Sequence, residues 1–444
     1  MVHNMTEGNP IRLILIFTVP LLIGNVFQQF YNIADVIIVG RFIGVHALAA
    51  VGATAPLFMA LLGLTIGLAS GLTVIMGQRF GAGDNDGVRR SFAMCVILSV
   101  AITLLLMAGA AAFMPFLLSL MNISADLYAD SYSYVMIVAN GLIAMMLYNL
   151  LSCACRALGD SRTPLYFLML SSVLNVILAL VFIIRFGWGV PGSAIALVAA
   201  QAVSALLCLI YMRLRFPMLR LKRQDWHWDT AFAWQHLRIG LPMAAQFLII
   251  SLGIIAIQSV CNTFGAETIA GFVSATRIEQ LAMQPMISLG IAMAVFSAQN
   301  YGAGRTDRIR RGVRQCSLVS LAFCALAAVA MFTQGREIIG IFTTEQDEQL
   351  LDAAWLYLTM SVPFYVFLGQ IFVYRNAVQG MGISIVPLAS SLIELVLRAA
   401  SAFILAASWG YFGICCASLI CWIAACLFTS GCYFYIMHNL PRFR

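Results

Sequence analysis

Long apolar stretches separated by short polar segments follow one another along this chain of 444 residues. A helix of about 20 apolar residues is long enough to cross the ~30 Å hydrocarbon core of a bilayer. The pattern predicts such helices near residues 13–40, 47–79, 91–118, 129–152, 164–186, 191–214, 238–262, 268–300, 315–333, 350–374, 385–407 and 411–437. We therefore expect an all-α integral membrane protein with twelve transmembrane helices.

A short motif occurs at the end of the second expected helix and again at the end of the eighth. Residues 78–83 read Gln-Arg-Phe-Gly-Ala-Gly, and residues 299–304 read Gln-Asn-Tyr-Gly-Ala-Gly. The same spacing relates Trp188 to Trp409, each of which is followed by a glycine. Repeats of this kind indicate two homologous halves. Because each half has an even number of helices, we expect parallel repeats that enter the membrane from the same side.

The repeat predicts how the chain divides into domains. We expect an N-terminal six-helix lobe in residues 1–215 and a C-terminal six-helix lobe in residues 238–444. The basic segment 216–237 joins them and contains Trp226, Trp228 and Trp234. Tryptophans beside basic residues are typical of a connector at the level of the lipid headgroups.

Composition and charge agree with a membrane location. Hydrophobic residues make up 62% of the chain and charged residues 10%, with a mean hydropathy of +0.94; soluble proteins carry about 25% charged residues. Threading through the expected helices puts most of the 25 Lys and Arg on one side, among them Arg375, Arg442 and Arg444. Only three arginines fall on the opposite side, namely Arg41, Arg185 and Arg336. Basic residues concentrate in cytoplasmic loops, so we expect both termini in the cytoplasm and no nucleic-acid partner for the net charge of +7.

Metal, nucleotide and disulfide chemistry find little support in the residue spacing. The twelve cysteines form no Cys-x-x-Cys pair, and we interpret them as small apolar side chains within helices. The five histidines are dispersed, so we expect no metal site; they are His3, His46, His227, His236 and His438. The glycine-rich loops lack the pattern of a nucleotide-binding loop. We expect neither a cofactor nor a catalytic centre.

Five ionisable residues lie well inside the expected helices: Asp35, Arg277, Glu279, Glu394 and Arg398. A charge at the membrane centre costs about 2.5–3.5 kcal/mol on translocon scales, so each is a functional candidate. Helical spacing puts Gln28 and Tyr31 on the face that carries Asp35. Removal from water favours a protonated carboxyl, and a nearby cation favours the ionised form. A proton and a cation can thus compete for Asp35, although an interfacial Asp with only a structural role would fit the same pattern.

The other in-membrane charges leave two interpretations open. Glu394 and Arg398 are four residues apart, in the favourable order for an ion pair along one helix. This pair is either a structural salt bridge or part of a binding site. Arg277 and Glu279 are two residues apart and do not face each other, so Glu279 is either a cavity carboxylate or a structural one.

These features together resemble the multidrug and toxic compound extrusion (MATE) family. The paired Gln-x-x-Gly-Ala-Gly motifs and the run from Pro20 to Asp35, with Val39-Gly40 after it, carry the resemblance over essentially the whole chain. It implies the MATE fold of two six-helix lobes and a monomer in the bacterial cytoplasmic (inner) membrane. It also implies secondary antiport by alternating access, in which organic cations or amphipathic drugs and metabolites leave in exchange for protons or sodium ions.

The resemblance also assigns roles to particular residues. Tyr31 and Asp35 match the ion-coupling site of the family's N-terminal lobe, and Asn175 matches the first residue of a helix-5 motif Asn-x-x-x-Asp. Ala179 stands where that motif has its aspartate, so one carboxylate of the pair is missing. The run Arg277-Ile278-Glu279 looks like the DinF and MepA branch of the family. We favour protons as the coupling ion, with sodium as the alternative.

Two other functions share some of these features. A lipid-linked saccharide or lipid flippase of the same superfamily would have a cavity rich in cations for diphosphates, whereas the expected spans here hold three acidic and two basic residues. A membrane-embedded transferase would need clustered carboxylates or paired histidines, and the sequence contains neither pattern. Antiport therefore remains the favoured function.

Overall fold

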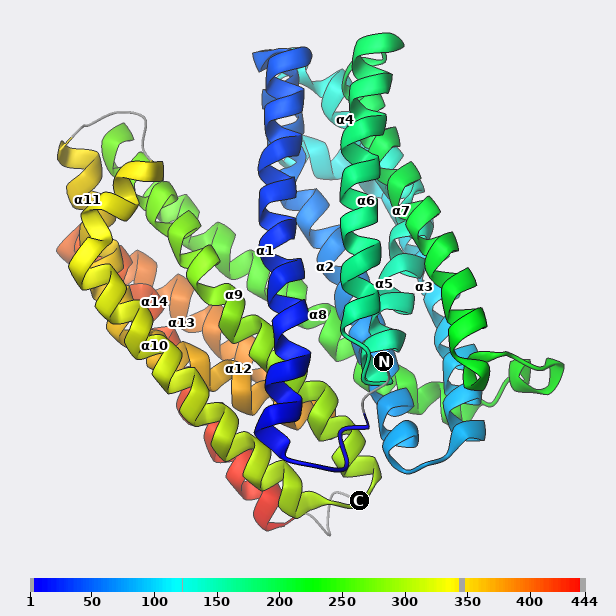
Figure 1. Cartoon of the computed structure of the whole chain (residues 1–444). Coiled ribbons are helices and arrows are strands. Elements are labelled where there is room, and N and C mark those ends of the chain that lie inside the picture. The colour runs from blue at the N-terminus through cyan, green and yellow to red at the C-terminus, as the bar shows by residue number, and fades with distance from the viewer. Residues whose placement is uncertain (1–3, 122, 343–347, 440–444) are drawn as a thin grey trace. The chain divides into compact units, whose positions relative to one another are not determined.

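The computed structural model describes residues 4–121, 123–342 and 348–439, and all regular structure within these ranges is helical (Figure 1). His3, Arg442 and Arg444, which entered the sequence predictions, lie outside these ranges. The elements in the first half are α1 (Pro10–Phe42), α2 (Val45–Gly81), α3 (Asn85–Leu120), α4 (Ala125–Asn140), α5 (Leu142–Ala157), α6 (Arg162–Leu180), η1 (Val181–Arg185) and α7 (Gly189–Arg215). Those after it are η2 (Pro217–Leu219), η3 (Arg223–Trp226), α8 (Thr230–Cys261), α9 (Ala266–Gly302), α10 (Thr306–Phe342), α11 (Glu348–Ser361), η4 (Val362–Phe364), α12 (Tyr365–Gly380), α13 (Ile385–Trp409) and α14 (Tyr411–His438).

The predicted number of transmembrane helices is confirmed for the described residues. Eleven segments are long and apolar enough to cross a membrane, and α4 with α5 forms a twelfth that is bent by 47°. The bend lies at Gly141, where a Cβ atom would come within 2.2 Å of the Val198 side chain on α7. Only glycine leaves room for this close approach. The expected helix 129–152 thus consists of two helical pieces, α4 and α5, and the expected helix 350–374 consists of three, α11, η4 and α12.

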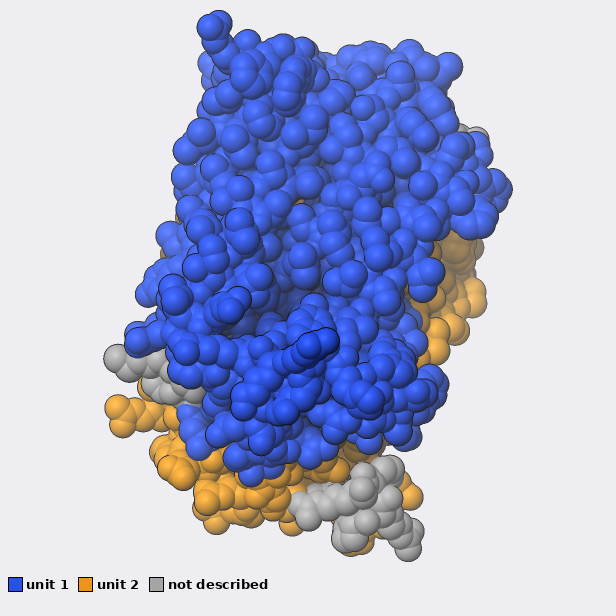
Figure 2. Space-filling model, turned by 90° about the vertical axis from the view of Figure 1, so that its right-hand side faces the viewer, with its two compact units in different colours: residues 1–4, 23–247 blue, residues 5–22, 248–444 orange. Residues whose placement is uncertain are grey.

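By internal packing the chain divides into two compact units, which Figure 2 shows in different colours. Unit 1 is built mainly from Ile23–Phe247, and unit 2 from Met5–Leu22 together with the chain from Leu248 onward. The sequence placed the division at 216–237, whereas the structural boundaries fall inside α1 and α8. The first part of α1 belongs to unit 2, and the first part of α8 belongs to unit 1. Each of these parts has its apolar partners in the unit to which it belongs.

Buried side chains show how the first parts of α1 and α8 are held. Ile14 and Phe17 of α1 belong to the apolar core of unit 2, where they join residues of α9 and α10. Ile239 and Met243 of α8 belong to a core of unit 1 that includes Leu72 of α2. Both helices therefore begin in one unit and end in the other.

Glycines on α2 let the first part of α8 approach closely. A Cβ atom at Gly67 would lie 2.5 Å from the backbone oxygen of Met243, and one at Gly71 would lie 2.6 Å from Cα of Gly240. Small residues at such contacts allow two membrane helices to pack backbone against backbone.

The basic segment 216–237 belongs to unit 1 and packs against its helices through part of its length. Phe216, Leu219 and Asp225 are buried, while Trp226 and Trp228 are about half exposed. Its contacts include η2 and η3 against α3. The segment is therefore anchored on the first repeat and is more than a tether between helices.

Candidate functional site

The residues predicted for ion coupling in the first lobe come together in unit 1. Helix α1 runs without interruption through Gln28, Tyr31 and Asp35, so its 3.6-residue period puts them along one side. The side-chain amide of Asn175 on α6 donates a hydrogen bond to the Tyr31 hydroxyl. Asn175 is 2% exposed, and its own Oδ1 is buried without a partner. This contact ties α6 to α1 four residues before Asp35.

The Asp35 carboxyl has no counter-ion among the residues that the structure describes. Within the described residues it accepts no hydrogen bond and takes part in no ion pair, and its side chain is partly buried. Tyr31 and Tyr134 are the groups whose hydroxyls lie close enough to interact electrostatically with it. A partly buried carboxylate without a cation beside it is free to take up a proton or a cation.

Ala179 occupies an apolar position, one turn after Asn175 on α6. It is fully buried and packs in a cluster with Ile38 and Ile183. Ile38 follows Asp35 by three residues on α1, so a carboxylate at position 179 would enter this cluster. The local packing is consistent with alanine there, and unit 1 brings Asp35 no second carboxylate from this helix.

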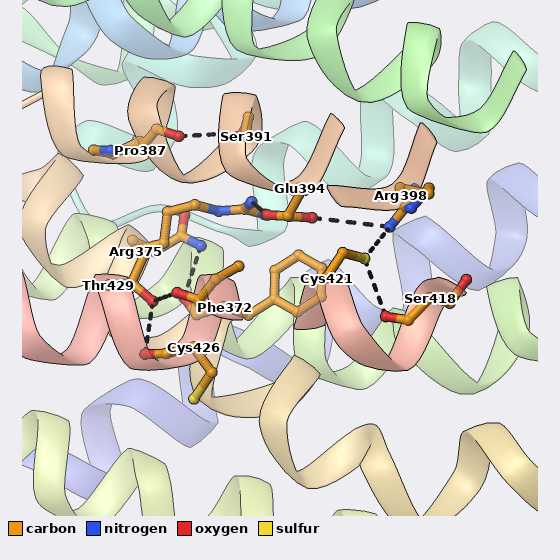
Figure 3. Close-up of polar contacts among 12 residues, drawn as sticks. Phe372, Arg375, Pro387, Ser391, Glu394, Arg398, Ser418, Cys421, Cys426 and Thr429 are labelled. Atoms are coloured by element: carbon orange, nitrogen blue, oxygen red, sulfur yellow. Dashed lines mark hydrogen bonds and ion pairs between the residues drawn. The ribbon is translucent and has the colours of Figure 1, made fainter. Parts of the chain in front are cut away.

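The charged residues predicted in the second lobe meet in unit 2, with a pairing that the sequence did not indicate. Glu394 Oε1 accepts a 3.1 Å hydrogen bond from Arg375 on α12. Arg398, the expected partner four residues along α13, is 4.0 Å from the other carboxylate oxygen. Figure 3 shows Glu394 between the two guanidiniums. The close ion pair therefore joins two helices and does not run along one.

Arg375 is the residue that the sequence analysis missed. The expected helix ends at residue 374 and leaves Arg375 on the cytoplasmic side, yet α12 continues to Gly380. Its side chain is 8% exposed. The return of apolar residues at Ala377 and Val378 is the signal that could have identified Arg375 as a residue within the helix.

Glu279 and Arg277 have different surroundings, although they are only two residues apart on α9. The Tyr357 hydroxyl of α11 donates a 3.3 Å hydrogen bond to Glu279 Oε2, and Arg398 is near enough to interact with the Glu279 charge. Arg277 is exposed. Glu279 thus belongs to the same charged group as Arg398.

The predicted site residues therefore form two sets. Gln28, Tyr31, Asp35 and Asn175 lie in unit 1, whereas Glu279, Glu394 and Arg398 lie in unit 2. Unit 1 presents an unpaired carboxyl, and unit 2 presents a mixed cluster with two arginines. All twelve cysteines are free thiols, and the described residues contain no cluster of three or more His, Cys, Asp or Glu side chains placed to hold a metal ion.

Comparison with known proteins agrees with this architecture. The family model described as MatE matches residues 20–181 and again residues 242–423. The probable multidrug resistance protein YoeA of Bacillus subtilis (strain 168) is 29% identical over 356 residues, covering 79% of this chain and 77% of the relative. The multidrug export protein MepA of Staphylococcus aureus (strain MSSA476) is 21% identical over 379 residues, covering 85% and 83%.

A solved structure described as "Crystal structure of MATE in complex with MaL6" has the same fold. It superimposes on this chain with a TM-score of 0.92 over 99% of both chains, at 22% sequence identity. The family model matches both repeats and covers more than half of the chain. The chain therefore belongs to the MATE family of multidrug efflux transporters, which are multi-pass membrane proteins and not enzymes.

Proposed function

We propose that this transporter exports organic cations and amphipathic compounds in exchange for protons by alternating access, and that Asp35 couples the two fluxes. The observation that carries the proposal is the Asp35 carboxyl, which is partly buried in a membrane helix and has no counter-ion among the described residues. Such a carboxylate gains from binding either a proton or a cation, but it has room for only one positive charge. That exclusion is the minimum chemistry of antiport.

The neighbours of Asp35 support a proton more than a sodium ion. Sodium, like other hard cations, is best held by several oxygen ligands at once. The second carboxylate that the family motif would supply is absent, since position 179 is alanine. Tyr31 is held by Asn175, which keeps one hydroxyl beside the carboxyl. A proton needs only the one carboxyl.

A dye-efflux assay in cells that lack their own efflux pumps tests the role of Asp35. We expect wild-type cells to exclude ethidium, and cells with Asp35→Asn to accumulate it while holding the same amount of folded protein in the membrane. Asp126→Asn is the matched control, because Asp126 lies in the same unit with a 67% exposed side chain. Normal efflux by Asp35→Asn would remove the proposed role.

Transport in vesicles separates protons from sodium ions. Exchange of one proton for one monovalent cation moves no net charge, so it draws only on the pH difference, at about 1.36 kcal/mol per pH unit. We expect an imposed pH gradient to drive uptake of ethidium into vesicles containing the purified protein. Collapse of the membrane potential alone should have little effect. Transport driven by a sodium gradient without a pH gradient would assign the coupling to sodium.

We propose further that this transporter lies in a bacterial inner membrane as a monomer, and the charge distribution supports both termini in the cytoplasm. Basic residues in short loops set the orientation of membrane proteins, and here they gather on the side that holds both ends of the chain. A reporter enzyme active only outside the cytoplasm, fused after the last helix, should be inactive. Activity of that fusion would reverse the orientation.

A further inference from the structure

Arg398 is a guanidinium in the membrane-spanning part of unit 2 with almost no hydrogen-bond acceptors. Its Nε–H is buried without a partner. One terminal nitrogen contacts the Cys421 sulfur at 3.5 Å and lies 4.0 Å from Glu394, beyond hydrogen-bond distance. Among the described residues, no oxygen accepts a hydrogen bond from Arg398. An arginine has five N–H donors and keeps its charge, so a buried one without acceptors is costly.

The nearby carboxylates do not supply the hydrogen-bond acceptors that Arg398 lacks. Glu394 gives its short contact to Arg375, at 3.1 Å, and so serves two guanidiniums with one charge. Glu279 interacts with Arg398 only at a distance and accepts its hydrogen bond from Tyr357. The geometry leaves the fork of Arg398 open, and a planar fork of this kind matches two oxygens of one carboxylate.

Space beside the guanidinium comes from a glycine on α8. A Cβ atom at Gly253 would already be in van der Waals contact with a terminal nitrogen of Arg398, at 3.7 Å. A larger side chain there would cover that nitrogen. The side chain of Arg398 is 13% exposed, so the protein does not cover it completely.

We propose that Arg398 is the residue that binds the carboxylate of amphipathic substrates that carry one. This rests on the proposed export function, but binding can be measured without transport. The ligand's carboxylate supplies two hydrogen-bond acceptor oxygens that the protein does not provide. Arg375 keeps its hydrogen bond to Glu394, and Tyr357 keeps its hydrogen bond to Glu279, so loss of Arg398 leaves neither carboxylate without a hydrogen-bond donor.

A matched pair of dyes tests the proposal: a rhodamine with a free carboxylate and its methyl ester. Their affinities for the purified full-length protein in detergent are measured by fluorescence anisotropy, with no ion gradient. Arg398→Gln should lower the affinity for the free acid about tenfold, since a hydrogen bond to a charged group contributes about this much to binding. It should lower the affinity for the ester less than twofold. Arg398→Lys keeps the charge but loses the fork, and should weaken the free acid severalfold.

Arg277→Gln is the control, because Arg277 is an exposed arginine in the same unit. It should leave both affinities unchanged. Equal losses for acid and ester in Arg398→Gln, or normal binding of the acid by both Arg398 variants, would overturn the proposal. Repeating the assay in nanodiscs distinguishes a substrate from a lipid: displacement of the acid by anionic lipid would make Arg398 a headgroup site instead. Failure of Asp35→Asn to affect efflux would leave these binding results intact.

Discussion

The Nε–H of Arg89 donates a 2.6 Å hydrogen bond to Oδ2 of Asp225, and both side chains are less than a tenth exposed. Arg89 follows the first Gly-Ala-Gly loop, and Asp225 lies in the segment that leads into α8. The second loop does the same for the chain before α1: Arg305 donates to the Thr6 carbonyl at 2.7 Å and Arg308 to the Gly8 carbonyl at 2.8 Å. In each half, arginines that follow the Gly-Ala-Gly loop therefore bind the segment that precedes α8 or α1.

Loss of the Arg89–Asp225 pair should destabilise unit 1, and removing Arg89 should cost more than removing the charge of Asp225. Arg89→Met leaves Asp225 buried without its cation, and breaking a buried pair costs about 3–5 kcal/mol. Asp225→Asn should cost less, because Arg89 keeps Asp86 at 2.7 Å. Chemical denaturation in detergent measures both. The control is Arg90→Met, whose pair with Asp229 is exposed and should matter little; equal effects of all three variants would contradict this ranking.

The Arg375–Glu394 pair should behave as a unit in a double-mutant cycle. Glu394→Gln leaves Arg375 buried and unpaired, which should lower the free energy of unfolding by about 3–5 kcal/mol. Removing both charges with Arg375→Met and Glu394→Met should cost much less than the sum of the single changes, since apolar side chains of similar size need no partner. Additive losses in thermal unfolding would show that the two residues act independently.

Gly71 should not tolerate a large side chain. Its Cβ position is 2.6 Å from Cα of Gly240 on α8, so Gly71→Leu must push two backbones apart. Overpacking typically costs about 1–3 kcal/mol, and a backbone clash more. Gly109→Leu on α3 is the control, because a Cβ atom there meets nothing within 4 Å. Apparent melting temperatures should fall only for Gly71→Leu, and an unchanged value would mean that α2 and α8 do not pack as described.

Asp229, which precedes α8 outside the membrane-spanning part, should confer a pH-dependent stability. The backbone N–H of Phe232 donates to its carboxylate at 3.1 Å and, with nearby Arg90, lowers the pKa of Asp229 below its usual value. A carboxyl with a lowered pKa in the folded state stabilises at pH values above its unfolded pKa, and this is lost as the pH falls through the folded one. Stability measured from about pH 5 downward should fall less steeply in Asp229→Asn. An identical slope would contradict the capping role.

Much of the site could be predicted because its residues are unusual in their surroundings. Asp35 and Glu279 interrupt apolar helices, where an ionisable group stands out. Their partners could not be predicted in the same way. Tyr357 and Asn175 are ordinary residues for membrane helices, and only the packing of α11 on α9 and of α6 on α1 brings their polar atoms to these sites.

The sequence by itself determined the helices, their number and the repeat. In hydrocarbon a backbone must satisfy its own hydrogen bonds, so an apolar run of sufficient length can only be a helix. Tertiary structure alone decided which charges pair and where the compact units divide. Glu394 is 3.1 Å from Arg375 on a neighbouring helix but 4.0 Å from Arg398 on its own helix. The helical period fixes how far apart side chains at positions i and i+4 lie, whereas the packing of two helices decides which side chains meet between them. The units divide inside α1 and α8 because buried apolar contacts, and not the order of the repeat, determine where each half of a long helix packs.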